Sequence, residues 1–167
     1  RPTRPLLLAF LGVIAVGTVL LMLPISSPGA GAAPFGDAVF TAASAVTVTG
    51  LTVVDTATYW TGFGEAVLLV LMQLGGLGIM TFTALLVVII GGRLGMRRRQ
   101  AAQAEQGILD PGEIKRVIIG VAILSAIIEA LLALVLFVRF VSLGFSAGNA
   151  AWDAVFQSVS AFNGAGF

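Results

Sequence analysis

Three long runs of apolar residues alternate with short polar stretches along the chain. They cover Leu6–Leu23, Glu65–Ile90 and Val117–Val141, and a membrane-spanning helix needs about 20 such residues. The pattern therefore predicts three transmembrane helices and an all-α integral membrane protein. The first run, with Arg1 and Arg4 before it, is also compatible with a secretory signal peptide, but the two longer runs that follow favour a span.

Two shorter apolar stretches lie between these runs or after them, and they resemble each other. DAVFTAASAVTVTG begins at Asp37, and DAVFQSVSAFNGAG begins at Asp153, 116 positions later. Seven of the fourteen aligned pairs are identical, including the DAVF start and the final pair, Gly50 and Gly166. The match indicates an internal repeat, which constrains the architecture before any other feature does.

Each repeat is too short to cross a membrane and too apolar for an external loop. As a helix, Phe35–Thr47 would span about 20 Å at 1.5 Å per residue. The sequence predicts instead that a short helix enters the membrane and that the chain returns in an extended form. We expect Asp37 and Asp153 to cap the N-termini of these helices. Their C-terminal ends, with partial negative charge, would then face the membrane centre and favour a cation.

The glycine-containing ends of both repeats are candidate ion-binding segments. Non-helical backbone at membrane depth persists where it is buried in protein or lines a water-filled cavity. Its carbonyl groups can replace the hydration shell of an alkali cation, and glycine permits the dihedral angles that align successive carbonyls. The alternative is that Gly50 and Gly166 serve simply as tight-turn glycines.

The composition limits the chemistry that the chain can perform. Charged residues make up 10% of its 167 residues, against about 25% in soluble domains. The sequence has no Cys and no His, which excludes disulfides, thiolate or imidazole metal sites and any nucleophile–histidine arrangement. We therefore expect neither an enzyme nor a cofactor. Nucleic-acid binding is not expected either, because the one basic run is short and flanks an apolar segment.

The placement of the charges predicts an orientation. Eight of the nine Lys and Arg residues fall on one side of a three-span topology, and the positive-inside rule makes that side, with the N-terminus, cytoplasmic. The basic run Arg97–Arg99 is interpreted as a topology signal rather than a site for lipid or nucleic acid. Asp55 and Trp152 are predicted to lie on the external side.

Three stretches of the sequence resemble a known family. FTAASAVTVTGLTVVDTATY, QLGGLGIMTF and FQSVSAFNGAGF are similar to the Trk/Ktr/HKT superfamily of potassium transporters, and in particular to the bacterial Ktr-type membrane subunit. The resemblance implies four helix–pore-loop–helix repeats of potassium-channel type around one ion path. About one and a half units would be present. Residues 1–95 would form the first unit, 96–113 a cytoplasmic connection, and 114–167 the first helix and pore loop of a second, truncated unit.

The resemblance also implies a substrate, partners and a selectivity filter. K⁺ is the expected transported ion, taken up through a multi-pass protein of the cell membrane. Some plant members with serine at the first filter glycine prefer sodium, so Gly50 favours K⁺ over Na⁺. The full-length protein is expected to be a homodimer with cytosolic nucleotide-binding regulatory subunits. The implied filter residues are Val46, Thr47, Val48, Thr49 and Gly50 in the first repeat, and Phe162, Asn163, Gly164, Ala165 and Gly166 in the second.

Two polar residues and a group of glycines stand inside the predicted spans. Gln73 is predicted to hydrogen bond with a neighbouring helix or pore helix. Glu129 is expected to anchor a pore loop, with a backbone N–H or Ser125 as its partner, and ion or proton coupling is the alternative. Gly75, Gly76 and Gly78 are interpreted as sites of close helix packing rather than as a hinge.

The functional hypothesis is K⁺ uptake through a carbonyl-lined filter, driven by the membrane potential. Na⁺-coupled K⁺ symport is an alternative within the same class. A non-conducting membrane assembly or scaffold module is the alternative from a different class. Cation occupancy beside Gly50 and Gly166 would separate transport from the scaffold.

Overall fold

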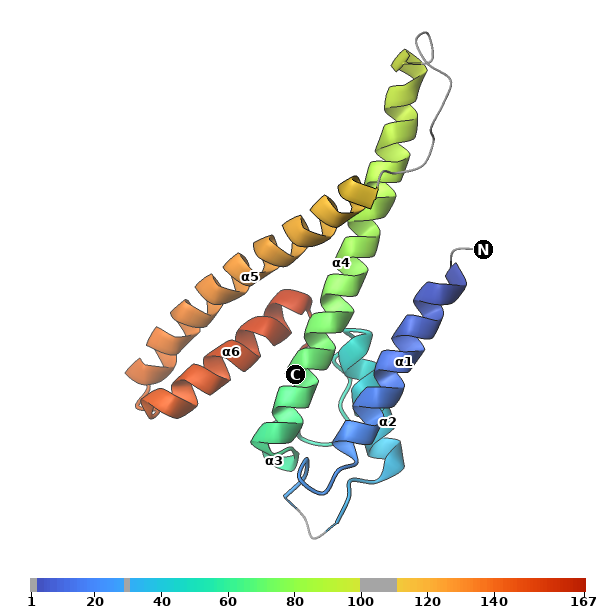
Figure 1. Ribbon diagram of the computed structural model, residues 1–167. Helices are drawn as coiled ribbons and strands as arrows, with labels where there is room; N and C mark the ends of the chain where they lie inside the picture. The colour runs from blue at the N-terminus through green and yellow to red at the C-terminus, as the bar shows by residue number, and fades with distance from the viewer. Residues whose placement is uncertain (1–2, 29–30, 100–110) are drawn as a thin grey trace.

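The described part of the chain is helical. The computed structural model describes residues 3–28, 31–99 and 111–167, and these ranges contain no strand. Figure 1 shows the helices in chain order. They are α1 (Thr3–Leu21), α2 (Phe35–Val46), α3 (Thr56–Tyr59), α4 (Gly62–Arg99), α5 (Pro111–Ser142) and α6 (Ala147–Asn163).

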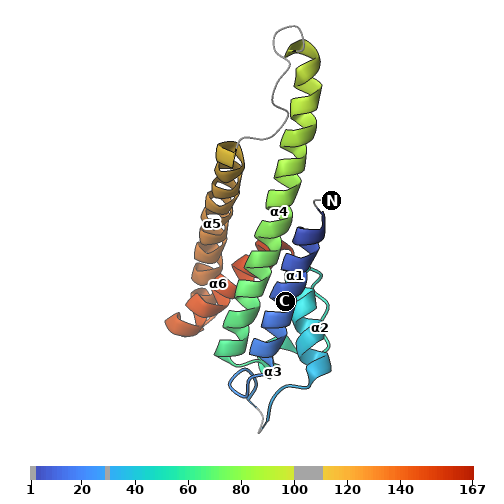
Figure 2. The ribbon, with the colours of Figure 1, turned by 45° about the vertical axis from the view of Figure 1, so that its right-hand side comes forward.

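The longest helix, α4, separates two pairs of helices. In both views α1 and α2 lie on one side of α4, and α5 and α6 lie on the other (Figures 1 and 2). The turn after α1, the short α3 and the α5–α6 turn gather at one end of the molecule, and the C-terminal end of α4 lies at the other. The shorter helices α2 and α6 start at the first end and stop part-way along α4.

The starts of α2 and α6 correct one expectation from the sequence. Pro34 precedes α2 and no side chain caps this helix, although Asp37 lies in its first turn. Asp153 lies well inside α6, which begins after Ser146, whose hydroxyl accepts a hydrogen bond from the Asn149 N–H (3.4 Å). Capping by Asp37 and Asp153 is therefore a wrong prediction. A proline with preset φ starts one helix, and a serine upstream of the repeat starts the other.

Two helices meet the requirements for a membrane span. Among the described residues, Gly62–Leu86 and Ile114–Ser142 are long and apolar enough to cross, whereas the apolar stretch Leu7–Leu21 of α1 is shorter. The three-span topology and its orientation therefore stay predictions. Residues 100–110 of the predicted cytoplasmic connection lie outside the described residues.

The packed core lies where α1, α2 and α4 meet. Ala38 and Ala42 of α2 and Leu68 and Met72 of α4 are completely buried there. In contrast, α5 is exposed along nearly its whole length, and large apolar side chains such as Val135 point outward. Exposed apolar surface of this extent is typical of a helix that lipid or further protein covers.

Candidate functional site

The candidate site consists of two stretches of chain. We call Val46–Gly50 the first segment and Phe162–Gly166 the second segment. Each starts in the last turn of a short helix, α2 or α6, and continues as non-helical backbone. In both views the C-terminus lies near the N-terminal half of α4 (Figures 1 and 2).

The backbone follows the same course in both segments. The φ angle is positive at Val48 (56°) and Gly50 (70°), and at Gly164 (72°) and Gly166 (72°), which are the positions related by the 116-residue offset. Between them, Thr49 and its counterpart Ala165 have negative φ, so the sign of φ alternates along each segment. Val48 is the one non-glycine residue with positive φ among those that the structure describes. A β-branched residue there is a conformational outlier, and such outliers cluster at functional sites.

Matched hydrogen bonds accompany this course. In each segment, one N–H bonds to a carbonyl five residues back and the preceding N–H bonds to a carbonyl three residues back. This pair of bonds is the Schellman arrangement, which ends a helix with a left-handed residue. From donor to acceptor, the four bonds are Thr49 to Ser44 (2.9 Å), Val48 to Ala45 (3.3 Å), Ala165 to Ser160 (2.8 Å) and Gly164 to Ala161 (3.1 Å).

The two segments touch each other at Gly50. A Cβ atom on Gly50 would lie 3.0 Å from the carbonyl carbon of Ala165 and would overlap the carbonyl oxygen. A Cβ atom on Gly166 would lie 3.9 Å from the Cα of Gly50, which is ordinary contact. Positive φ favours glycine at both positions, whereas the close approach requires glycine at Gly50 alone.

Two adjacent glycines of α4 each pack closely against one of the two segments. A Cβ atom on Gly75 would lie 2.8 Å from the carbonyl carbon of Val46, at the start of the first segment. A Cβ atom on Gly76 would lie 2.6 Å from Cγ of Asn163, in the second segment. The prediction that these glycines permit close packing is confirmed, because a side chain at either position would overlap its neighbour.

A polar cluster of Gln73, Glu129 and Asn163 lies beside the second segment. Gln73 Nε2 donates a hydrogen bond to Glu129 Oε2 (3.1 Å). Asn163 Nδ2 donates to Gln73 Oε1 (3.0 Å), to Glu129 Oε1 (3.3 Å) and to the Val159 carbonyl (2.9 Å). The cluster thereby links α4, α5 and the end of α6.

The partners of Glu129 differ from those expected. The structure gives it two side-chain amides in place of a backbone N–H or Ser125, whose hydroxyl lies 3.9 Å from the Met80 sulfur. The filter role that the resemblance implies for Asn163 stays a prediction. The Asn163 side chain bonds toward α4 and α5. The one sequence signal for this bonding is that Asn163 stands where the first repeat has Thr47.

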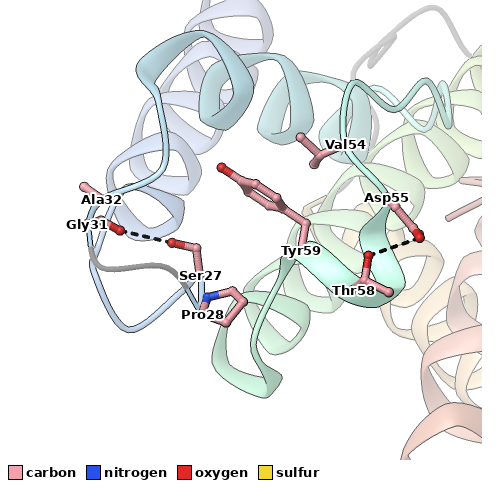
Figure 3. Close-up of a pocket in the computed structure, with 8 residues that line it drawn as sticks. All are labelled: Ser27, Pro28, Gly31, Ala32, Val54, Asp55, Thr58 and Tyr59. Carbon is pink, nitrogen blue, oxygen red and sulfur yellow. Dashed lines mark hydrogen bonds between the residues drawn. The ribbon is translucent and has the colours of Figure 1, made fainter.

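A pocket of about 650 Å³ lies at the end of the molecule formed by α3 and the turn after α1. Figure 3 shows the Tyr59 ring and the Asp55 carboxylate among its lining residues. Asp55 accepts hydrogen bonds from the Ala57 N–H (3.2 Å) and the Thr58 hydroxyl (3.1 Å), so it caps α3, a helix that the sequence did not predict.

Side chains do not form a metal centre in the described residues. No group of three or more Asp or Glu residues there is arranged to hold a metal ion. Binding of a cation by the backbone carbonyls of the two segments stays a prediction.

Comparisons with known proteins place the chain among transporters. It matches the family model TrkH, described as a cation transport protein, over residues 8–167. It is 43% identical to the Ktr system potassium uptake protein B of Bacillus subtilis and 40% identical to that of Vibrio alginolyticus, over 99% and 98% of the chain and 37% and 35% of those proteins. It is 31% identical to the potassium/sodium uptake protein NtpJ of Enterococcus hirae, over 99% of the chain and 37% of that protein. The chain thus spans little more than a third of the length of these relatives.

Proposed function

We propose that this chain, which belongs to the TrkH family of cation transport proteins, takes part in K⁺ uptake and that its two segments line the ion path. The observation that carries the proposal is the matched backbone of the segments. Positive φ recurs at Val48 and Gly164 and again at Gly50 and Gly166. A tight turn needs one such residue, whereas two alternate ones in each repeat indicate a specific backbone course.

The alternating sign of φ along each segment affects the direction in which its carbonyl groups point. In an ordinary strand, successive carbonyls point to opposite sides of the chain. When residues of opposite hand alternate, successive peptide groups turn so that their carbonyls share one side. A row of carbonyls on one side can replace the water around an alkali cation. Selection of K⁺ over Na⁺ would follow from the number and spacing of these oxygens.

The short helices add to the attraction for a cation. The first segment leaves the C-terminal end of α2, and the second leaves the C-terminal end of α6. Helix C-termini carry about half a negative charge each, from carbonyls without helical partners. Two such ends beside one path would favour a cation and disfavour an anion.

The relatives suggest the ion and the coupling to test. Two are named potassium uptake proteins and one a potassium/sodium uptake protein. We propose K⁺ as the transported ion of the full-length protein, with Na⁺-coupled K⁺ symport as the second candidate. A homodimeric assembly and control by cytosolic nucleotide-binding subunits form part of the same proposal.

The proposed orientation places the end with α3 and the α5–α6 turn outside the cell. Cysteine labelling can test it without background, because the sequence has no Cys. A cysteine at Trp152 is expected to react with an impermeant reagent added to intact cells, and one at Arg98 is expected to react after lysis alone. Reaction of the Arg98 variant in intact cells would contradict the orientation.

Ion uptake by the full-length protein tests the function itself. The protein is expressed in a bacterial strain that lacks K⁺ uptake of its own, and K⁺ uptake is measured with and without Na⁺. Uptake independent of Na⁺ supports uniport, and uptake that requires Na⁺ supports symport. Protein that accumulates in the membrane without any K⁺ flux would contradict the proposal and favour the scaffold.

A further inference from the structure

Two aligned serines support the segments differently. Ser44 and Ser160 occupy equivalent positions in the repeat, and both are buried, at 5% and 2% exposure. The Ser160 hydroxyl accepts a hydrogen bond from the Phe167 N–H (2.9 Å) and donates one to the Phe167 carbonyl (3.1 Å). The Ser44 hydroxyl has no hydrogen-bond partner among the residues that the structure describes.

The residues that directly follow the two segments also differ, in how far they are buried. Phe167 is partly buried against the core. Its aligned counterpart, Leu51, is 58% exposed and continues toward α3. Phe167 is therefore held by the Ser160 side chain of α6, whereas no side chain of α2 bonds to Leu51 in the part of the chain that the structure describes.

Ser160 holds the second segment at two points. Its carbonyl oxygen accepts from the Ala165 N–H (2.8 Å), and its hydroxyl accepts from the Phe167 N–H. The first bond holds the peptide group between Gly164 and Ala165, and the second holds the peptide group between Gly166 and Phe167. The Gly166 carbonyl belongs to the second of these peptide groups, so the bond to the Ser160 hydroxyl limits its rotation.

We propose that Ser160 is a positioning residue that sets the carbonyl geometry of the second segment and thereby contributes to ion selection. The aligned Ser44 does not have this role. The inference rests on the proposed function, because it assumes that the second segment contacts the ion. It goes further by assigning part of the selectivity to one side chain that does not contact the ion.

The experiment compares two matched variants, Ser160→Ala and Ser44→Ala, in the full-length protein. Each removes a single buried oxygen from the same position of the repeat. We expect Ser160→Ala to lower the ratio of K⁺ to Na⁺ uptake about tenfold, equivalent to about 1.4 kcal/mol. Ser44→Ala is expected to keep the wild-type ratio. The amount of protein in the membrane is measured for both, so that the ratio is separated from a loss of folding.

Wild-type selectivity in a folded Ser160→Ala variant would overturn the inference, as would an equal loss in Ser44→Ala. If the alanine variant fails to accumulate, Ser160→Cys provides the test, because cysteine keeps the shape of the side chain and weakens its hydrogen bonds. A reduced ratio in the cysteine variant supports the inference, and an unchanged ratio overturns it. Failure of the wild-type protein to take up K⁺ would instead contradict the proposed function.

Discussion

The first and second segments have the same backbone conformation but differ in the side-chain contacts that stabilise it. Both end a short helix in the same hydrogen-bond arrangement and both have positive φ at the same two repeat positions. The first segment is bordered by Gly75 of α4, and its Thr47 and Thr49 hydroxyls bond to each other. The second is bordered by Gly76, and its Asn163 side chain donates to Gln73 and Glu129. The backbone N–H of Phe167, the next residue, donates to the Ser160 hydroxyl.

The comparison shows which features of the site depend on nearby residues in the sequence and which depend on distant ones. The backbone course depends on how each helix ends, and this is determined within a few residues of sequence. The polar supports depend on elements that are distant in sequence, because Gln73 and Asn163 lie 90 residues apart. One repeated backbone can therefore be stabilised in two ways.

The largest expected effect comes from serine at Gly50. The new Cβ would overlap the Ala165 carbonyl at a position with positive φ, so we expect loss of the K⁺ preference by well over tenfold. Gly166→Ser has room for its Cβ and is strained by its φ alone, at about 1–2 kcal/mol. It should act in the same direction with a smaller effect. The measurement is K⁺ against Na⁺ uptake in the full-length protein, and equal selectivity in both variants and wild type would show that these are ordinary turn glycines.

Alanine substitutions at Gly75 and Gly76 test the packing of each segment against α4 separately. Gly75→Ala meets the backbone of Val46, which cannot rotate away, and Gly76→Ala meets the Asn163 side chain, which can move by giving up its hydrogen bonds. Overpacking of this kind costs about 1–3 kcal/mol, so both variants should unfold at lower temperature in detergent, Gly75→Ala more so. Gly78→Ala is the control on the same helix, because its Cβ would lie 3.4 Å from the flexible Phe10 ring. Equal stability of all three would contradict the close packing.

Substitutions of Glu129 test the polar cluster that stabilises the second segment and not the first. Glu129→Gln keeps one oxygen to accept from one of the two amides, and its new N–H can donate once the other amide turns its oxygen toward it, so most of the transport should remain. Glu129→Leu removes the acceptor of Gln73 Nε2, whereas Asn163 Nδ2 keeps its bonds to Gln73 and to the Val159 carbonyl. An unsatisfied buried group costs about 1–3 kcal/mol, so the membrane should hold less folded protein. Ion flux and membrane abundance are measured together. A glutamine variant that accumulates normally but has no flux would instead favour the ion- or proton-coupling role.

The smallest effect is expected for the stability of Ser44→Ala. Because its hydroxyl is buried without a partner in the ranges that the structure describes, its removal relieves an unsatisfied group instead of breaking a bond. The melting temperature of the purified full-length protein should therefore stay unchanged or rise slightly. Ser160→Ala, which loses both bonds to Phe167, should melt at a lower temperature. A clear drop for Ser44→Ala would show that this hydroxyl has a partner in the full-length protein.

The sequence predicted the features that local patterns determine. The helical stretch of α2, expected over Phe35–Thr47, is visible in hydropathy. So are the apolar cores of α4 and α5, and identity alone shows the repeat offset that relates Val48 to Gly164. The start of α6 was missed because the repeat begins inside that helix, at Asp153. The partners of Glu129 were missed because the direction of a side chain between packed helices depends on tertiary contacts, which no short pattern records.

The adjacent positions of Gly75 and Gly76 have a mechanical consequence. Neighbouring residues of an α-helix point about 100° apart around its axis and differ by 1.5 Å along it. A rigid rotation or translation of α4 would therefore displace its contacts with Val46 and with Asn163 in the same movement. The two segments are kinematically linked through one helix, so α4 cannot shift to accommodate one of them without disturbing the other.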